Sequence, residues 1–524
     1  MSPLEKKSEH LTEVYPGEKN VEEPINPILE EIKAMTPDEY AAFDKRLMRK
    51  IDMRIIPWMT VLYLMSFLDR VNVGTAKLHG LQQDLNLTGN EFNIASLIFF
   101  VSYVFFEVPS NLVLKRLRPS VFLPATMVLW AIFQTLMGLV TNYGQLLAMR
   151  FCLGMFEAGL FPGVNFYLNG WYRRSELSKR TAFFFGGAVM AGAFGGIFGY
   201  ALGEMGGIGK LHGGPMLGWR WIFIIEGLLT FVIAVASFWM VHDWPDRAKF
   251  LTEFEREFVH YRLANDTGIA GGGQFKMKEV IRGIFDWKTI LYMLCYIGCA
   301  ECIYSQSLFV PSIVQQLGKW TTAQSLLLSV PPYAVAFITT MATAYLSDKF
   351  MKRGVFNMFW STLGVVGYLI LMTVPLKQVG ARYFAVFLTT MAIAPLISNT
   401  ITWCGNNIYG HYKKATAMGL VFSCGNSGGI VASLVYRDQD KPRYMPGHAT
   451  ALAFVAMNGI TSVIIYFGLK AANKKREREY GLVEDNEKHN IDDPEYLNRW
   501  GLTGMERNDI LNLGDDHPAF RYIL

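Results

Sequence analysis

Charged residues are scarce in this sequence of 524 residues. Asp, Glu, Lys and Arg make up 18% of the chain, against about 25% in a typical soluble domain, and hydrophobic residues make up 51%. A soluble core stops growing near ~250–300 residues, so a soluble chain of this length would need several domains joined by polar linkers. The apolar residues instead form long uncharged blocks, such as 121–144, 357–375, 383–409 and 415–436. A helix crosses a bilayer in about 20 such residues, and the composition therefore predicts an all-α membrane protein.

Three further features are missing or weak. The six cysteines all lie inside apolar blocks, which argues against a secreted disulfide framework. Cys295, Cys299 and Cys302 share one helix face by their spacing, which small-residue packing explains better than a metal site, and we expect no metal and no cofactor. The first ~50 residues lack the apolar core of a signal peptide, so the first spanning helix should direct membrane insertion. The net charge of +5 is too small to indicate a nucleic-acid partner.

The apolar blocks predict twelve transmembrane helices. The predicted spans are 55–77, 91–114, 119–141, 144–170, 179–204, 219–242, 284–316, 322–347, 355–375, 381–406, 414–436 and 447–470. A polar stretch divides them six and six, which is typical of a two-lobed transporter. The predicted parts are an N-terminal tail (1–50), a first six-helix lobe (51–243), a central loop (244–283), a second six-helix lobe (284–471) and a C-terminal tail (472–524). Both tails are polar and are expected to be flexible or bound to the surface.

Lys and Arg near the helix ends set the expected orientation. With the N-terminus in the cytoplasm, cationic residues at the inner ends outnumber those at the outer ends by more than two to one. The bias predicts a multi-pass protein with both termini in the cytoplasm. The sequon Asn86-Leu87-Thr88 then lies in the first outer loop, where Asn86 is a candidate for glycosylation.

Ionisable residues inside a span are costly and point to function. The second half of the chain has mainly Glu301, whereas the spans of the first half contain a cluster: Asp69, Arg70, Glu107, Arg150, Glu157 and Glu226. Asp69 and Arg70 should share a level with Arg150, which makes an ion pair between the first and fourth spans feasible. On the fourth span, Glu157 and Asn165 continue the face that Arg150 begins.

This pattern predicts an anion site with a proton carrier beside it. Arg70, Arg150 and Asn165 are the candidate substrate ligands, because an arginine stays charged and binds a carboxylate in bidentate geometry. Asp69 and Glu157 are the candidate proton-coupling groups, since a buried carboxyl can load and release a proton near neutral pH. The alternative is a buried ion-pair network that only locks helices together.

Other polar residues in the spans have weaker assignments. In the second half, Tyr304, Gln306, Asn399 and Trp403 could contact a ligand by hydrogen bonds or stacking, although many such groups instead join neighbouring helices. Gating or structural roles are predicted for the remaining charged residues, which are Glu107, Arg116, Glu226 and Asp348.

Several motifs resemble one transporter family. They are Asp69-Arg70-Val71-Asn72, Phe106-Glu107-Val108-Pro109-Ser110-Asn111, Arg116-Leu117-Arg118-Pro119-Ser120, Arg150 through Gly159, Gly218 through Gly227, and Lys441-Pro442-Arg443-Tyr444. Together they resemble the anion:cation symporter family of the major facilitator superfamily, in its fungal branch of allantoate, pantothenate and nicotinate permeases. The resemblance implies the twelve-helix major facilitator fold, alternating access and proton-coupled uptake of small organic anions. Asp69, Glu157, Arg70 and Arg150 match that family's acidic and cationic positions, whereas Glu301 departs from its pattern.

The expected function is therefore a plasma-membrane symporter of protons and a small organic anion, working as a monomer in the lipid bilayer. Nicotinate is the first candidate substrate, with pantothenate or allantoate as alternatives. A metabolite efflux carrier on the same fold and a non-transporting nutrient sensor remain open. His79 and Asp84 fit an acyltransferase spacing by letter, but the pair sits in a short loop, and we expect no enzyme.

Overall fold

The computed structural model describes residues 27–211, 214–266, 277–318, 320–482 and 494–524. Nearly all of the regular structure in these residues is helical. The elements are α1 (Pro27–Ala34), α2 (Pro37–Leu78), α3 (Leu81–Asp84), α4 (Glu91–Arg116), α5 (Pro119–Met137), α6 (Tyr143–Glu157), α7 (Leu160–Asn169), α8 (Arg174–Gly203), β1 (Lys210–Leu211), β2 (Gly214–Pro215), α9 (Gly218–Met240), η2 (Pro245–Arg247), α10 (Glu253–Asp266), α11 (Met277–Phe285), α12 (Trp287–Leu317), α13 (Thr322–Phe350), α14 (Arg353–Thr373), α15 (Val379–Asn407), α16 (His411–Val435), η4 (Asp438–Asp440), α17 (Met445–Tyr480), α18 (Pro494–Arg499), α19 (Arg507–Leu513) and η5 (Gly514–Asp516).

The predicted all-α fold with twelve spans is confirmed. Among the described residues, 12 helical segments are long and apolar enough to cross a membrane, and α6 with α7 forms one of them. The fourth span is predicted as one helix, but it breaks between Glu157 and Leu160. The first span is longer than predicted, because Thr36 and Glu39 form a capping box that starts α2 in polar sequence.

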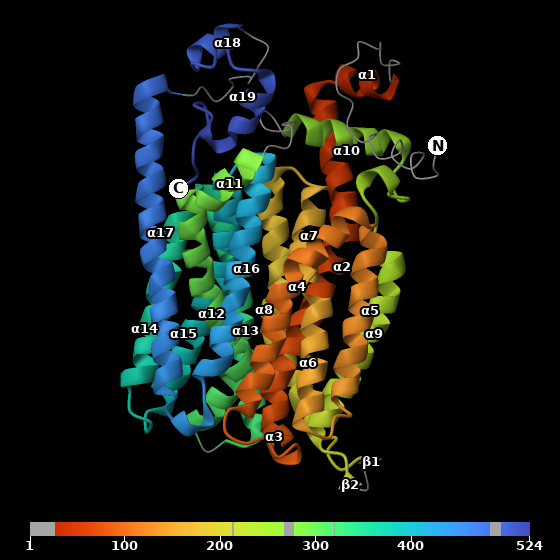
Figure 1. Ribbon diagram of the computed structural model, residues 1–524, viewed down its shortest axis with the longest axis vertical. Helices are drawn as coiled ribbons and strands as arrows, with labels where there is room; N and C mark the ends of the chain where they lie inside the picture. The colour runs from red at the N-terminus through yellow and green to blue at the C-terminus, as the bar shows by residue number, and fades with distance from the viewer. Residues whose placement is uncertain (1–26, 212–213, 267–276, 319, 483–493) are drawn as a thin grey trace, which may run out of the picture.

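The spans form two bundles whose long axes run nearly parallel (Figure 1). We call α2 and α4–α9 the first lobe and α12–α17 the second lobe. Between the lobes, α8 packs on α13, α4 on α16 and α2 on α12. Glycine permits the closest of these approaches. A Cβ atom on Gly192 of α8 would stand 2.5 Å from the Tyr333 ring of α13, and one on Gly196 would stand 2.7 Å from the Leu326 carbonyl oxygen.

The two ends of the bundle differ. Helices α1, α10, α11, α18 and α19 lie at one end, which we call the terminal face, whereas α3 and the β1–β2 hairpin lie at the other, the far face (Figure 1). On the terminal face, α10 is tied to the first lobe, because Arg262 forms ion pairs with Asp44 and Glu176. The segment 494–524 packs on the second lobe.

The C-terminal segment differs from the predicted flexible or surface-bound tail. Asp515 is fully buried and forms ion pairs with Lys288 of α12 and Lys413 of α16. The Tyr522 hydroxyl accepts a hydrogen bond from Lys288 at 3.0 Å, and Asn473 of α17 donates to the Tyr522 carbonyl at 2.8 Å. Buried ion pairs and main-chain hydrogen bonds therefore fix a segment whose local composition is polar.

Candidate functional site

A buried ion pair joins the first and fourth spans at the centre of the first lobe. Arg70 of α2 donates from Nη2 to Glu157 Oε1 at 2.7 Å and from Nε to the same oxygen at 2.9 Å. Ser66, one turn earlier on α2, donates to that oxygen at 2.5 Å. The other oxygen, Glu157 Oε2, is buried and has no hydrogen-bond partner. Glu157 is the last residue of α6, so the helix break places its carboxyl where α2 can reach it.

Aromatic rings surround the Arg70 guanidinium. Its central carbon lies 4.8 Å from the ring centres of Phe67 and Tyr103, 5.4 Å from that of Phe99 and 5.7 Å from that of Tyr304. Only Tyr304 comes from the second lobe, on α12. Cation–π attraction strengthens when the cation is removed from water, so this ring of aromatic groups stabilises a buried arginine whose hydrogen bonds go to a single acid.

Arg150 and Asp69, whose shared level made an ion pair between the first and fourth spans feasible, are not hydrogen-bonded to each other. Arg150 is 3% exposed, its Nη2 has no hydrogen-bond partner, and it lies within electrostatic range of Glu157 and Asp69. Asp69 accepts a hydrogen bond from the Trp130 indole at 3.2 Å, and its Oδ1 has no partner. Of the two arginines, Arg70 thus holds the acid of the fourth span, while Arg150 keeps a donor available.

A polar link crosses between the lobes beside this cluster. Glu107 of α4 accepts hydrogen bonds from Asn426 of α16 at 3.2 Å and 3.1 Å. The Asn426 side-chain oxygen accepts a hydrogen bond from the Tyr304 hydroxyl at 2.7 Å. Because the Tyr304 ring faces Arg70, one connected network runs from Glu157 to Glu107 through both lobes. In the first lobe, Glu226 accepts a hydrogen bond from Asn72.

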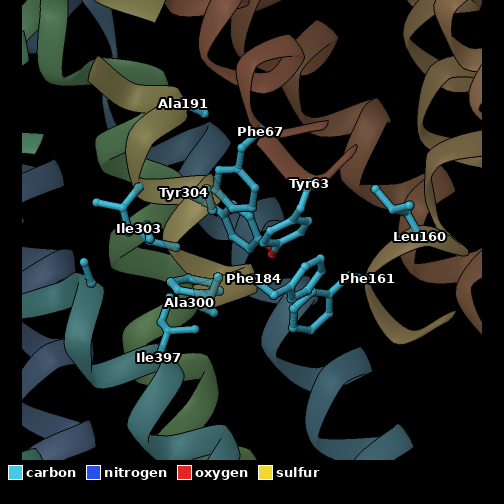
Figure 2. Close-up of a cluster of buried hydrophobic side chains, with 14 of the residues drawn as sticks. Tyr63, Phe67, Leu160, Phe161, Phe184, Ala191, Ala300, Ile303, Tyr304 and Ile397 are labelled. Carbon is cyan, nitrogen blue, oxygen red and sulfur yellow. The ribbon is translucent and has the colours of Figure 1, made fainter. Parts of the chain in front are cut away.

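Aromatic side chains of the first lobe and Tyr304 of the second lobe gather in the buried core (Figure 2). Tyr63 stacks on Phe184 with ring centres 4.4 Å apart and on Phe161 at 5.3 Å, while Phe161 meets Phe422 of the second lobe at 5.1 Å. A cavity beside them is lined from both lobes, with Phe67 and Gln306 among its walls. Its free centre is no larger than a water molecule, so the lobes close around the site in this state.

Three predicted ligand residues make other contacts. Asn165 donates to the Phe161 carbonyl of its own helix at 2.9 Å. Asn399 donates to the Arg353 carbonyl at 2.8 Å, and the Trp403 indole donates to the Ile523 carbonyl of the C-terminal segment at 2.8 Å. None of these three hydrogen bonds involves Arg70, and the ligand roles of the three residues stay predictions.

The remaining predicted residues are dispersed. Asp348 forms an ion pair with Arg353 at 2.5 Å at the terminal face. Asn86 lies between α3 and α4 with a positive φ of 51°, and nothing in the structure tests its glycosylation. The side chain of Arg116 lies outside the part of the chain that the structure describes.

A link between the lobes at the far face is a feature that the sequence analysis missed. Lys77 of α2 forms an ion pair with Asp438 of η4 at 3.0 Å, and Gln82 donates to the same carboxylate at 3.0 Å. Burial alone would raise the pKa of Asp438, but hydrogen bonds and positive charge from Lys441 and Lys77 lower it to about 2. In the sequence, Lys77 could be noticed as a lysine at the end of the first predicted span. Nothing in the sequence indicated that Asp438, in a distant loop, is its partner.

The chain matches known transporters over most of its length. The family model described as Major Facilitator Superfamily matches residues 59–433. An uncharacterized transporter of Schizosaccharomyces pombe is 35% identical over 432 residues, which cover 82% of this chain and 85% of that protein. The MFS-type transporter efuF of Hormonema carpetanum is 32% identical, covering 83% and 87%. The major facilitator-type transporter hxnP of Emericella nidulans is 30% identical, covering 94% and 97%.

Solved structures share the fold at low sequence identity. The proton:xylose symporter XylE aligns with a TM-score of 0.61 and 13% identity, over 79% of this chain and 96% of that one. A bacterial homologue of the human lysosomal transporter Spinster, in an inward-facing and occupied conformation, aligns with a TM-score of 0.58 and 14% identity, over 80% and 97%. These likenesses concern the arrangement of the helices.

Proposed function

The chain belongs to the major facilitator superfamily, and from that premise we propose that it imports a small organic anion together with protons. The first candidate substrate is a vitamin-like monocarboxylate such as nicotinate, within the anion:cation symporter family that the sequence motifs resemble. In this proposal the protein lies in the plasma membrane with its terminal face in the cytoplasm. The observation that carries it is a buried arginine, Arg70, held by one acid and enclosed by aromatic rings from both lobes.

Proton and substrate transport are coupled because Glu157 and the substrate carboxylate bind Arg70 in turn. Ionised Glu157 occupies the guanidinium, so an entering carboxylate would have to compete with it. A proton on Glu157 removes that negative charge and leaves Arg70 available for a bidentate bond to the substrate. Loss of the proton toward the cytoplasm restores the ion pair and expels the anion. Substrate and proton thus favour the same loaded state.

The second acid–arginine pair extends this scheme. Arg150 has a free donor and lies within electrostatic range of both Asp69 and Glu157. We assign Asp69 as a second proton carrier and Arg150 as the group that attracts the substrate carboxylate into the first lobe. A buried arginine without a hydrogen-bonded acid costs free energy, and an anionic ligand would offset that cost.

The surroundings of Arg70 favour a flat substrate. Phe67 and Tyr304 lie nearly parallel, with ring centres 6.3 Å apart and an angle of 15° between their planes. Opening of the lobes would allow an aromatic ring to enter between them, with its carboxylate on Arg70. A planar aromatic acid gains stacking energy there that an aliphatic acid of equal charge lacks.

Uptake into a yeast strain that lacks its own permeases tests the proposal. Cells producing the protein should accumulate radiolabelled nicotinate when the medium is acid, and pantothenate and allantoate in parallel define the substrate. Glu157→Gln should abolish accumulation driven by the pH gradient and retain exchange of internal for external substrate. Glu253→Gln, on the exposed part of α10, is the matched control and should transport normally.

Three outcomes would contradict the proposal. Full gradient-driven accumulation by the Glu157→Gln protein would remove the proton role from Glu157. Faster loss of substrate from preloaded cells, with no uptake from the medium, would identify an efflux carrier. Binding without any flux would identify a sensor.

A further inference from the structure

One buried acid has no role in the scheme above. Glu301 lies in the middle of α12 and is fully buried. Ser305, one turn later, donates to Glu301 Oε1 at 2.7 Å. The other oxygen, Oε2, is buried without a hydrogen-bond partner. Among the described residues, no Lys, Arg or His forms an ion pair with this carboxyl, in contrast to Glu157.

A second cavity lies inside the second lobe, and Ser305, the hydrogen-bond donor to Glu301, is part of its wall. Its walls include Ser305, Gln306, Tyr368, Tyr436 and His448. Three of these residues present buried polar atoms without a hydrogen-bond partner, namely Gln306 Nε2, the Tyr368 hydroxyl and His448 Nε2. The other ring nitrogen of His448 is 3.1 Å from the Tyr436 hydroxyl. Unpartnered polar atoms in a buried wall indicate a site that is used by a small polar species.

The cavity lies between Glu301 and the far face. Glu301 is 14 residues into α12, roughly 20 Å from the end of that helix at the terminal face. His448 lies in the first turn of α17 at the far face, and Arg382 lies in the first turn of α15 beside it. Buried donors on Arg382 also have no partner. Polar groups thus continue from the mid-level acid to the outer end of the lobe.

Size and chemistry identify the occupant class. The free centre of the cavity is no larger than a water molecule, which excludes an organic anion. A hard metal cation prefers a shell of about six oxygen ligands, several of them carboxylates, whereas the residues that line this cavity supply hydroxyl, amide, imidazole and apolar groups and no carboxylate. Hydroxyl groups, an amide and water can pass a proton along a chain. The titratable and charged groups around Glu301 and this route are Cys302, Tyr368, Tyr436, Tyr444, His448 and Arg382.

We propose that Glu301 is a proton-binding site of the second lobe, loaded from the far face through the cavity of Tyr368 and His448. This site goes beyond the proposed function, which places its protons on Asp69 and Glu157 of the first lobe. Gln306 lines both this cavity and the central one, so it connects the loading of Glu301 to the substrate region. In a carrier with proton-binding acids in both lobes, the rearrangement of either lobe can move a bound proton.

Infrared difference spectroscopy tests the site without any substrate. The full chain in lipid nanodiscs is titrated between about pH 5 and about pH 8, the range that a physiological proton carrier must cover. The wild type should show a carboxylic-acid band that appears on acidification and is lost in Glu301→Gln. Ser305→Ala should shift the band's frequency, because the hydroxyl donor to the carboxyl is removed. Tyr368→Phe and His448→Gln alter the cavity wall and should shift the midpoint pH of the band.

Each outcome decides the proposal. An unchanged spectrum in Glu301→Gln overturns it, and if that variant fails to fold, an unchanged band frequency in Ser305→Ala does so. A band that sodium chloride suppresses and choline chloride does not would identify a metal-cation site instead. A midpoint insensitive to Tyr368→Phe and His448→Gln would overturn the route of entry. Glu253→Gln should leave the spectrum unchanged.

Transport by proteoliposomes supplies a separate readout that rests on the proposed function. With radiolabelled nicotinate and a set membrane potential, Glu301→Gln should lower the number of protons moved per anion by one. An unchanged ratio overturns the coupling of Glu301 to transport. If the wild type moves no nicotinate, the proposed substrate is wrong, and the infrared result still decides whether Glu301 binds a proton.

Discussion

The ion pair between Lys77 and Asp438 should stabilise the closed far face, and the structure allows the size of this stabilisation to be estimated. It joins the first span to a loop of the second lobe at the far face. Asp438→Asn removes the charge and preserves the size of the side chain. We expect the far face to open more often, because alternating access requires this contact to break each time the site faces outward.

The magnitude follows from the pKa of Asp438, which is lowered from 3.8 to about 2. A shift of nearly two units corresponds to roughly 2.5 kcal/mol, and exposure of about a third of the side chain reduces this to roughly 1–2 kcal/mol through solvent screening. Part of the lowering of the Asp438 pKa comes from Lys441, which belongs to the same lobe. That part remains when the lobes separate. About half of this free energy therefore comes from the contact between the lobes. Its loss changes the ratio of closed to open protein by roughly two- to fivefold.

The sign of the pH dependence follows from the same shift. Because the pKa of Asp438 is depressed in the closed state, its contribution is fully present above about pH 4 and is lost as the pH falls through about 2. The link therefore holds at any pH above about 4. Acidity that drives proton uptake should leave the far-face contact intact.

Alkylation of a cysteine placed under the contact measures the effect. Ser96 is buried on α4 one turn below Asn93, which donates to the Ser433 carbonyl across the lobes at 2.6 Å. In a Ser96→Cys background, Asp438→Asn should raise the alkylation rate two- to fivefold. Lys441→Ala should raise it much less, since it breaks a contact within one lobe. Equal rates for Asp438→Asn and the background, or equal effects of the two variants, would refute the reasoning.

Three further predictions concern the site, the lobe interface and the C-terminal segment. Arg150→Ala should raise the transport KM for nicotinate far more than that for neutral nicotinamide, and equal effects in competition assays would count against an anion-binding role. Gly192→Val should abolish transport, because its side chain enters the Tyr333 ring, while Gly380→Val, which meets nothing within 4 Å, should transport normally in the same uptake assay. Asp515→Asn should lower the thermal unfolding midpoint in detergent by several degrees, since breaking a buried ion pair costs about 3–5 kcal/mol, and the half-exposed Asp516→Asn should lower it less.

Most of the fold is predictable because hydropathy is local. Each uncharged block needs only its own residues to become a helix in lipid, and the predicted spans match the helices of the structure. Two features of these helices depend on causes that hydropathy does not contain. The polar start of α2 depends on a capping box at Thr36, and the break after Glu157 lies next to Gly159, whose Cβ would stand 2.8 Å from Ser110.

The charged residues of the candidate site can be picked out from the sequence, whereas their contacts cannot. Charged residues in apolar spans single out Arg70, Arg150 and Glu157 without any structure. Trp403 was a candidate ligand by residue type, but its indole holds the Ile523 carbonyl of the C-terminal segment. A tryptophan in a span has the same local pattern whether it faces a substrate or a docked segment, so composition could not separate the two.

By itself, the sequence determined the membrane class, the twelve helices and the concentration of charge within the first six spans. Only the tertiary structure decided that Glu157 pairs with Arg70, that Tyr304 of the second lobe joins the aromatic side chains around that arginine, and that Glu301 is hydrogen-bonded to Ser305 in the wall of a second cavity. The physical reason is that these contacts depend on the rotation, tilt and depth of helices far apart in the chain. Helical periodicity sets the face on which a residue lies, and packing sets which other face it meets.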